Sequence, residues 1–332
     1  MCYGNWEILI STQVVAGTVA ALVQTTLLYP FEFFKSVFQL QRNVKDCPKY
    51  IQGGSHQFKT YFAGCLSVNV GILLKTGTRF YVFDKVNEML EGENILGSRV
   101  VVAGGITGFM ESLCIVPFEN VKMLMMENAL IQSYRREHPN EKLALTEIKS
   151  KHAHKKTFHK KANLSQNEIS FLQYEKSPSN GLFGGIRELY STKGIRGFYQ
   201  GCGLTIFRQV GNSVTLFTSF TILSQLLSNQ NTGRMDSYTT VAVSLLSASS
   251  VVAITQPIDV MKTRMQSKYA WKYYTNSLNC AYRLAVEEGI GKFWKGWAPR
   301  LMKIGLSSTV SISMYTYVSN VLNTMRHDGV LK

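Results

Sequence analysis

The sequence lacks the residue patterns that mark most catalytic and metal-binding sites. Its six cysteines have neither the spacing of zinc ligands nor that of a disulfide framework, and we interpret them as packing residues. No nucleophile stands in a recognisable arrangement with a general base, so the chain is not predicted to be an enzyme and no cofactor is expected. The N-terminal stretch has no charged region ahead of an apolar one, so we expect no cleavable signal.

Acidic residues are scarce, with 21 Asp and Glu against 36 Lys and Arg, which gives a net charge of +15. A basic protein of this kind can bind nucleic acid, so the position of the charge decides between a nucleic-acid-binding protein and a membrane protein. Two windows, Tyr61–Leu74 and Val100–Met110, are short and continue through isolated charges. Four uncharged windows have roughly the length of a membrane span: Ile8–Phe31, Val210–Gly233, Ser237–Ile258 and Ile304–Thr324. The low mean hydropathy fits helices that each turn one polar face to water inside a bundle.

One motif occurs three times, each time at the end of an apolar run. It consists of a proline, an acid two residues later and a lysine three residues after the acid. The copies are Pro30-Glu32-Lys35, Pro117-Glu119-Lys122 and Pro257-Asp259-Lys262. Proline has no amide hydrogen and clashes with the preceding turn, so we expect a bend at each copy. The acid and the lysine stand at i and i+3 and can project from one helix face. The recurrence predicts a repeat protein.

A second recurring step, an aromatic residue two positions before a glycine, opens the next helix of each unit. Its copies are Phe62–Gly64, Tyr199–Gly201 and Trp294–Gly296. We divide the chain into units 1–95, 96–230 and 234–328, each made of a helix, a surface segment and a helix. The first helix is expected from near Trp6 to near Gln39.

The second unit is longer because of a polar insertion at about 130–178. Residues 134–176 hold ten Lys and Arg against five Asp and Glu. His152, His154 and His159 fall in this segment, but no cysteine or acidic ligand accompanies them at fixed spacing. We therefore favour a solvated basic loop over a metal site.

The tripled motif and the aromatic steps resemble those of the mitochondrial carrier family over nearly the whole chain except residues 134–176. Several stretches are most similar to the citrate (tricarboxylate) carriers: Pro117-Phe118-Glu119, Ile206–Gln209 with Asn212, Lys272–Asn276, Pro299–Leu301, and the pair Lys75 and Arg79. The chain departs from these carriers in having Leu216 where a further base stands and Ser307 near an acidic position. Only Phe83-Asp84, with Asn87 in place of a base, remains of the network expected on the cytoplasmic side.

The resemblance implies an all-α membrane protein with six transmembrane helices in three pseudo-symmetric repeats and short matrix surface helices. It places a multi-pass monomer in the inner mitochondrial membrane, bound to cardiolipin, with both termini toward the intermembrane space. Ion pairs between helices would close the matrix side; these gate residues are Glu32, Lys35, Glu119, Lys122, Asp259 and Lys262, with helix kinks at Pro30, Pro117 and Pro257. Substrate carboxylates would bind at Lys75, Arg79, Arg208, Gln209, Asn212 and Lys303.

The predicted function is the transport of an anionic metabolite, citrate or a related di- or tricarboxylate, by alternating access. We expect no matching acid of the motif to face the four bases of the binding site, which favours an anion over an amino acid or a cation. A carrier for another carboxylate remains an alternative. The identity of the counter-substrate is left open, as is the choice between exchange and one-way transport. A nucleotide carrier is disfavoured by Arg208-Gln209, and a membrane anchor associated with RNA or the ribosome rests only on the insertion, which has no recognisable binding module. No nucleic-acid partner is therefore expected.

Overall fold

A computed structural model describes residues 3–41, 58–89, 96–137, 170–171, 173–174, 177–179, 181–227 and 237–327, and the regular elements in these ranges are all helices. The long helices among them are α1 (Tyr3–Leu27) with its continuation α2 (Tyr29–Leu40), α4 (Cys65–Met89), α5 (Leu96–Glu137), α9 (Cys202–Leu227), α10 (Ser237–Gln266) and α13 (Trp297–His327). The short ones are α3 (Phe58–Tyr61), α8 (Leu182–Phe198), α11 (Ala270–Tyr273), α12 (Ser277–Arg283), the π-helix η2 (Leu284–Glu288) and the 3₁₀-helix η3 (Ile290–Trp294).

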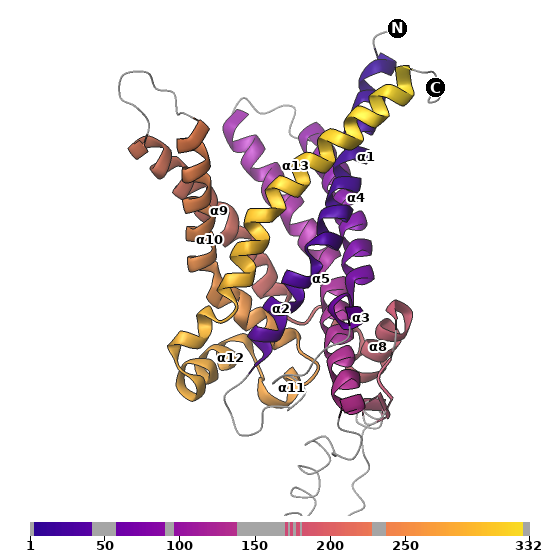
Figure 1. Cartoon of the computed structure of the whole chain (residues 1–332), viewed down its shortest axis with the longest axis vertical. Coiled ribbons are helices and arrows are strands. Elements are labelled where there is room, and N and C mark those ends of the chain that lie inside the picture. Colours follow the sequence, from indigo (N-terminus) through magenta and orange to yellow (C-terminus); the bar gives the residue numbers. More distant parts are fainter. Residues whose placement is uncertain are drawn as a thin grey trace, which may run out of the picture.

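The long helices pack in chain order into a closed ring. Each contacts the one before and the one after it, and α13 returns to α1. The most extensive contacts join α4 to α5, α9 to α10 and α13 to α1, so they lie between the predicted units. The start of α1 and the end of α13 lie together at one end of the ring, whereas α3, α8, α11 and α12 gather at the other end (Figure 1).

The first predicted helix is two helices. It begins at Tyr3, is interrupted at Leu28, and continues from Tyr29 to Leu40 after a bend of 54°. Pro30, in the first turn of α2, has no amide hydrogen to give to the turn before it, which explains the break. By contrast, α5 and α10 run through Pro117 and Pro257 without ending.

Three glycines at equivalent places allow the units to pack closely. Gly64, Gly201 and Gly296 have φ values of 87°, 78° and 82°, a region that other residues rarely adopt. A Cβ at Gly64 would lie 3.0 Å from the carbonyl oxygen of Lys122, and one at Gly296 would lie 3.2 Å from that of Lys35. The third glycine packs against the end of α10. Each glycine thus lets the start of one helix touch the motif-bearing helix of the next unit.

Hydropathy alone marks few of these helices as membrane spans. Within the described ranges, Ala242–Gln266 is long and apolar enough to cross a membrane, with a mean hydropathy of 1.4, and the bent pair α1–α2 is a second candidate if counted as one span. The other long helices include charged residues within their apolar stretches, such as Arg79 in α4, Glu111 in α5 and Arg208 in α9. The arrangement of six spans therefore stays a prediction.

Helix α5 continues to Glu137, into the segment where the insertion is predicted to begin. Met126, Leu130 and Tyr134 follow one another at a spacing of four residues and are all buried in a core cluster with residues of α2. Later in the predicted insertion, Phe171 packs edge-on against Tyr269, with ring centroids 5.6 Å apart. The three histidines considered as metal ligands lie outside the described residues.

Candidate functional site

The acid and lysine residues of the repeated motif meet where α2, α5 and α10 converge. Each acid contacts a lysine from another unit: Lys35–Asp259 at 2.7 Å, Lys262–Glu119 at 2.6 Å, and Lys122–Glu32. The three pairs therefore link the three helices in a cycle. Asp259 is the least accessible of the acids, with 2% of its side chain exposed. Charges this far from water are tolerated only when they are paired.

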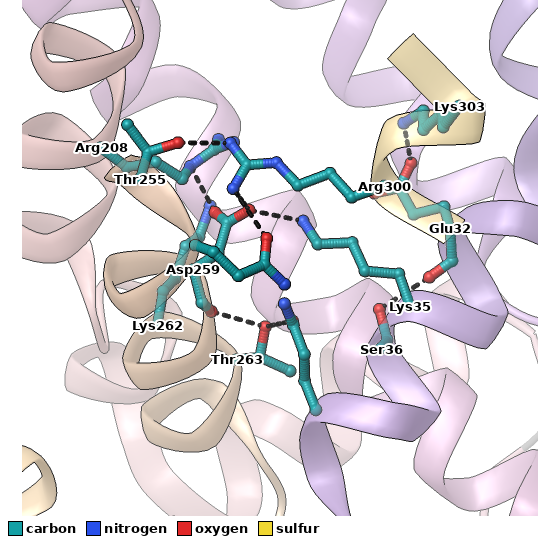
Figure 2. A network of polar contacts seen from close by, with 12 residues as sticks. Glu32, Lys35, Ser36, Arg208, Thr255, Asp259, Lys262, Thr263, Arg300 and Lys303 are labelled. Atoms are coloured by element: carbon teal, nitrogen blue, oxygen red, sulfur yellow. Dashed lines mark hydrogen bonds and ion pairs between the residues drawn. The ribbon is translucent and has the colours of Figure 1, made fainter. Parts of the chain in front are cut away.

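Asp259 contacts two bases in addition to the lysine that the motif supplies. Besides Lys35 from α2, it contacts Arg208 from α9, with the Nε atom 3.3 Å from Oδ1, and Arg300 from α13, with the Nη1 atom 2.8 Å from Oδ2. Figure 2 shows these three side chains converging on the carboxylate from different helices. Asp259 is thus the centre of the polar network.

Arg300 is held by neutral groups as well. Its guanidinium donates to Thr255 Oγ1 at 2.7 Å, to Gln256 Oε1 at 3.0 Å and to Asn212 Oδ1 at 3.2 Å. With 6% of its side chain exposed, Arg300 is a buried part of the network. A planar group with several fixed donors suits this position better than a lysine would.

The other two acids also have a second base. Lys303 of α13 contacts Glu32, and Arg208 reaches Glu119 with its Nη2 atom 3.9 Å from Oε1. The network therefore joins three carboxylates to six bases: Lys35, Lys122, Arg208, Lys262, Arg300 and Lys303. It carries three positive charges more than its own acids balance.

A separate charged cluster lies on α4 and α5. The Nε atom of Arg79 is 2.5 Å from Glu111 Oε1, and its Nη2 atom is 3.2 Å from Oε2. Lys75, one turn away, places its Nζ atom 3.4 Å from the same carboxylate. Glu111 has 5% of its side chain exposed, whereas Arg79 has 55% and Lys75 has 28%. The two bases are open to solvent and the acid lies behind them.

A family profile described as "Mitochondrial carrier protein" matches residues 8–94, 165–231 and 233–326. The chain belongs to the mitochondrial carrier family. As a member of this family it is a transporter and not an enzyme.

Three relatives align with this carrier over nearly its full length. An uncharacterized mitochondrial carrier of Saccharomyces cerevisiae is 37% identical over 93% of this chain and 95% of its own. The mitochondrial citrate transporter A of Aspergillus niger is 32% identical over 93% of this chain and 91% of its own. The tricarboxylate transport protein of Saccharomyces cerevisiae is 26% identical, with 92% of this chain and 93% of that protein covered.

The expectation that no acid of the motif faces the binding bases is wrong for this carrier. Arg208 and Lys303 contact the motif acids, while Glu111 pairs with Lys75 and Arg79. Glu111 lies outside the repeated motif, six residues before Pro117, so the motif gave no sign of it. The signal was its charge inside an apolar stretch of α5, where a charged side chain needs a partner.

The remaining predicted binding residues lie on α9 beside this network. Asn212 accepts a hydrogen bond from Arg300, and Gln209 is adjacent to Arg208 in the chain. Arg300 itself was not among the predicted site residues, although it stands three residues before Lys303, on the same face of α13. The side chains of Phe83, Asp84 and Asn87, from which the reduced cytoplasmic network was predicted, lie outside the described part of the structure.

A further polar cluster lies at the end of the ring that holds α8. Lys268 contacts Glu188 of α8 at 2.6 Å, and 2% and 0% of these two side chains are exposed. Lys193 of α8 donates to Gln200 Oε1 at 3.1 Å and to the carbonyl oxygen of Ser267 at 3.0 Å. Burial lowers the pKa of Lys193 to about 8; the charge of Lys268 adds to this effect, whereas that of Glu188 opposes it.

Proposed function

We propose that this carrier transports a small polycarboxylate, citrate or a related di- or tricarboxylate, across the inner mitochondrial membrane. The observation that carries the proposal is the charge of the central network. Three carboxylates face six bases there, five of which have 21% or less of the side chain exposed. Partly buried positive charge without matching acids is costly, and a polyanion would balance it. A tricarboxylate carries the matching number of charges.

The positions of the bases also suit a ligand with several carboxylates. The predicted binding bases come from three helices: Lys75 and Arg79 from α4, Arg208 from α9 and Lys303 from α13. A single carboxylate can use one or two of them, because an arginine already offers it two parallel donors. A molecule with two or three carboxylates can engage several helices at once. The printed names of two relatives, a citrate transporter and a tricarboxylate transport protein, support the same substrate class.

Substrate binding and gate opening would be coupled through shared bases. Arg208 and Lys303 contact the gate acids Asp259 and Glu32. An anion that draws these two bases toward itself weakens their hold on the gate acids. The substrate would thereby favour the state in which the network is broken, as alternating access requires. The gate role of Glu32, Lys35, Glu119, Lys122, Asp259 and Lys262 is part of this proposal.

The same features support an orientation in the membrane. We infer six transmembrane helices in three repeats, with the intact ion pairs closing the matrix side and both ends of the chain toward the intermembrane space. The position of α3, α8, α11 and α12 at the end of the ring away from the start of α1 and the end of α13 supports this assignment (Figure 1). We expect a monomer. We also expect it to bind cardiolipin, because the starts of α4, α9 and α13 offer amide groups to phosphate.

Uptake into liposomes tests the proposal. The purified full-length protein is reconstituted, and the uptake of labelled citrate, malate, oxoglutarate and ATP is measured with each unlabelled compound inside in turn. We expect citrate or one of the dicarboxylates to exchange and ATP not to. Exchange of ATP alone would instead identify a nucleotide carrier, and the absence of any uptake by protein with a normal melting transition would contradict the transport of a polycarboxylate.

A further inference from the structure

A buried carboxylate lies where the proposed substrate site needs positive charge. Glu111 of α5 stands behind Lys75 and Arg79 of α4, the two bases of the site that come from one helix. These three residues form what we call the α4–α5 triad. Its acid is the best shielded member, with 5% of the side chain exposed.

Glu111 is bound as a substrate carboxylate would be. Both of its oxygens are engaged by Arg79, one by Nε at 2.5 Å and one by Nη2 at 3.2 Å. This is the two-donor grip by which arginine recognises carboxylates. A guanidinium has five N–H donors, so about three of them remain on a side chain that is 55% exposed. The triad can therefore receive a ligand while Glu111 keeps its place.

We propose that Glu111 is a specificity-determining residue that lowers the charge of the triad from two to one. The inference rests on the proposed function and concerns which polycarboxylate is preferred. With Glu111 ionised, the triad balances one substrate charge, and the other two charges of a tricarboxylate are left to the central network. Without that negative charge, the triad would attract the more highly charged ligand more strongly than the less charged one.

The relative affinity for citrate and malate measures this effect. KM and kcat are determined for both compounds in liposomes with wild-type protein and with Glu111→Gln, which removes the charge but keeps one acceptor oxygen for Arg79. We expect the ratio of the malate KM to the citrate KM to rise by about three- to tenfold in this variant. We also expect kcat for citrate to fall because a more tightly held substrate is released more slowly.

Two further variants extend the test, and Lys75→Gln keeps it decisive if Glu111→Gln does not fold. Lys75→Gln lowers the triad charge by one and should shift the KM ratio in the opposite direction. The double variant Glu111→Gln with Lys75→Gln has the wild-type triad charge and should return the ratio toward the wild-type value. Glu88→Gln makes the same chemical change at an exposed position of α4, where Glu88 pairs with Lys85 at 2.7 Å, and should leave the ratio unchanged.

The outcomes separate this inference from the proposed function. A wild-type protein that transports neither citrate nor malate contradicts the proposed function. If the wild type transports both compounds and Glu111→Gln raises both KM values by the same factor, Glu111 only positions Arg79 and the specificity role is wrong. A KM ratio that follows the triad charge through all three variants supports the inference.

Discussion

Arg208 offers the sharpest test of how substrate and gate share a base. It contacts Asp259 at 3.3 Å and Glu119 at 3.9 Å, and 21% of its side chain is exposed. A hydrogen bond to a charged group contributes about 1.5–3 kcal/mol, which corresponds to roughly 10- to 150-fold in binding. We therefore expect Arg208→Ala to reduce citrate uptake by about one to two orders of magnitude.

The protein should nevertheless stay folded in this variant. Asp259 keeps Lys35 at 2.7 Å and Arg300 at 2.8 Å, and Glu119 keeps Lys262 at 2.6 Å, so no gate acid is left without a partner. The melting temperature in detergent should change little. Arg208→Lys should recover only part of the uptake, because lysine retains the charge but not the two-donor geometry.

The assay is uptake of labelled citrate into liposomes at matched protein content, with thermal unfolding as the check on folding. Arg283→Ala is the control, since Arg283 is 42% exposed and its ion-pair partner among the described residues is Glu287 of the adjoining η2, at 3.6 Å. An exposed pair of this kind contributes about 0.2–1 kcal/mol, so uptake should be unchanged. Citrate uptake by Arg208→Ala at the wild-type rate would show that Arg208 only joins helices and does not bind substrate.

Three further predictions concern the gate, pH and lipid. Glu119→Lys should abolish uptake because it sets a positive charge against Lys262, and adding Lys262→Glu should restore part of it; equal activity of the single and double variants would contradict the ion pair. The pKa of Lys193 is lowered to about 8, so the folded state disfavours its charge and the free energy of unfolding should rise between about pH 8 and 10.5, on the order of 1–3 kcal/mol; Lys193→Met should flatten this rise in denaturant titrations, and an identical slope in both proteins would refute it. Cardiolipin should raise the melting temperature in detergent more than a zwitterionic lipid does, and equal shifts would count against specific binding.

The sequence predicted the residues of the central network better than their partners. The proline motif shows which acid and which lysine share a helix face, but the pairing of Lys35 with Asp259 depends on how the helices close into a ring. This contact joins residues 224 positions apart, and no local spacing encodes it. Short-range features were easier to predict from the sequence, because the break near Pro30 follows from the chemistry of proline alone.

Charges outside the motif were the main omission. Glu111 and Arg300 both lie in helices that the sequence marked as largely apolar, and each has polar partners that only the structure identifies. A rule that every charge in such a helix needs a partner would have flagged both residues. It would not have named the partners, because Glu111 binds across to α4 and Arg300 binds across to α10 and α9.

The crowding of bases around Asp259 gives the three similar units unequal parts in any movement. Separating α10 from its neighbours requires Lys35, Arg208 and Arg300 to leave one carboxylate, whereas Glu32 and Glu119 each hold two bases. The contacts of Glu32 and Glu119 should therefore break first and those of Asp259 last. A protein built from three similar units would then open in a fixed sequence, with α10 as the stationary member about which the other helices turn.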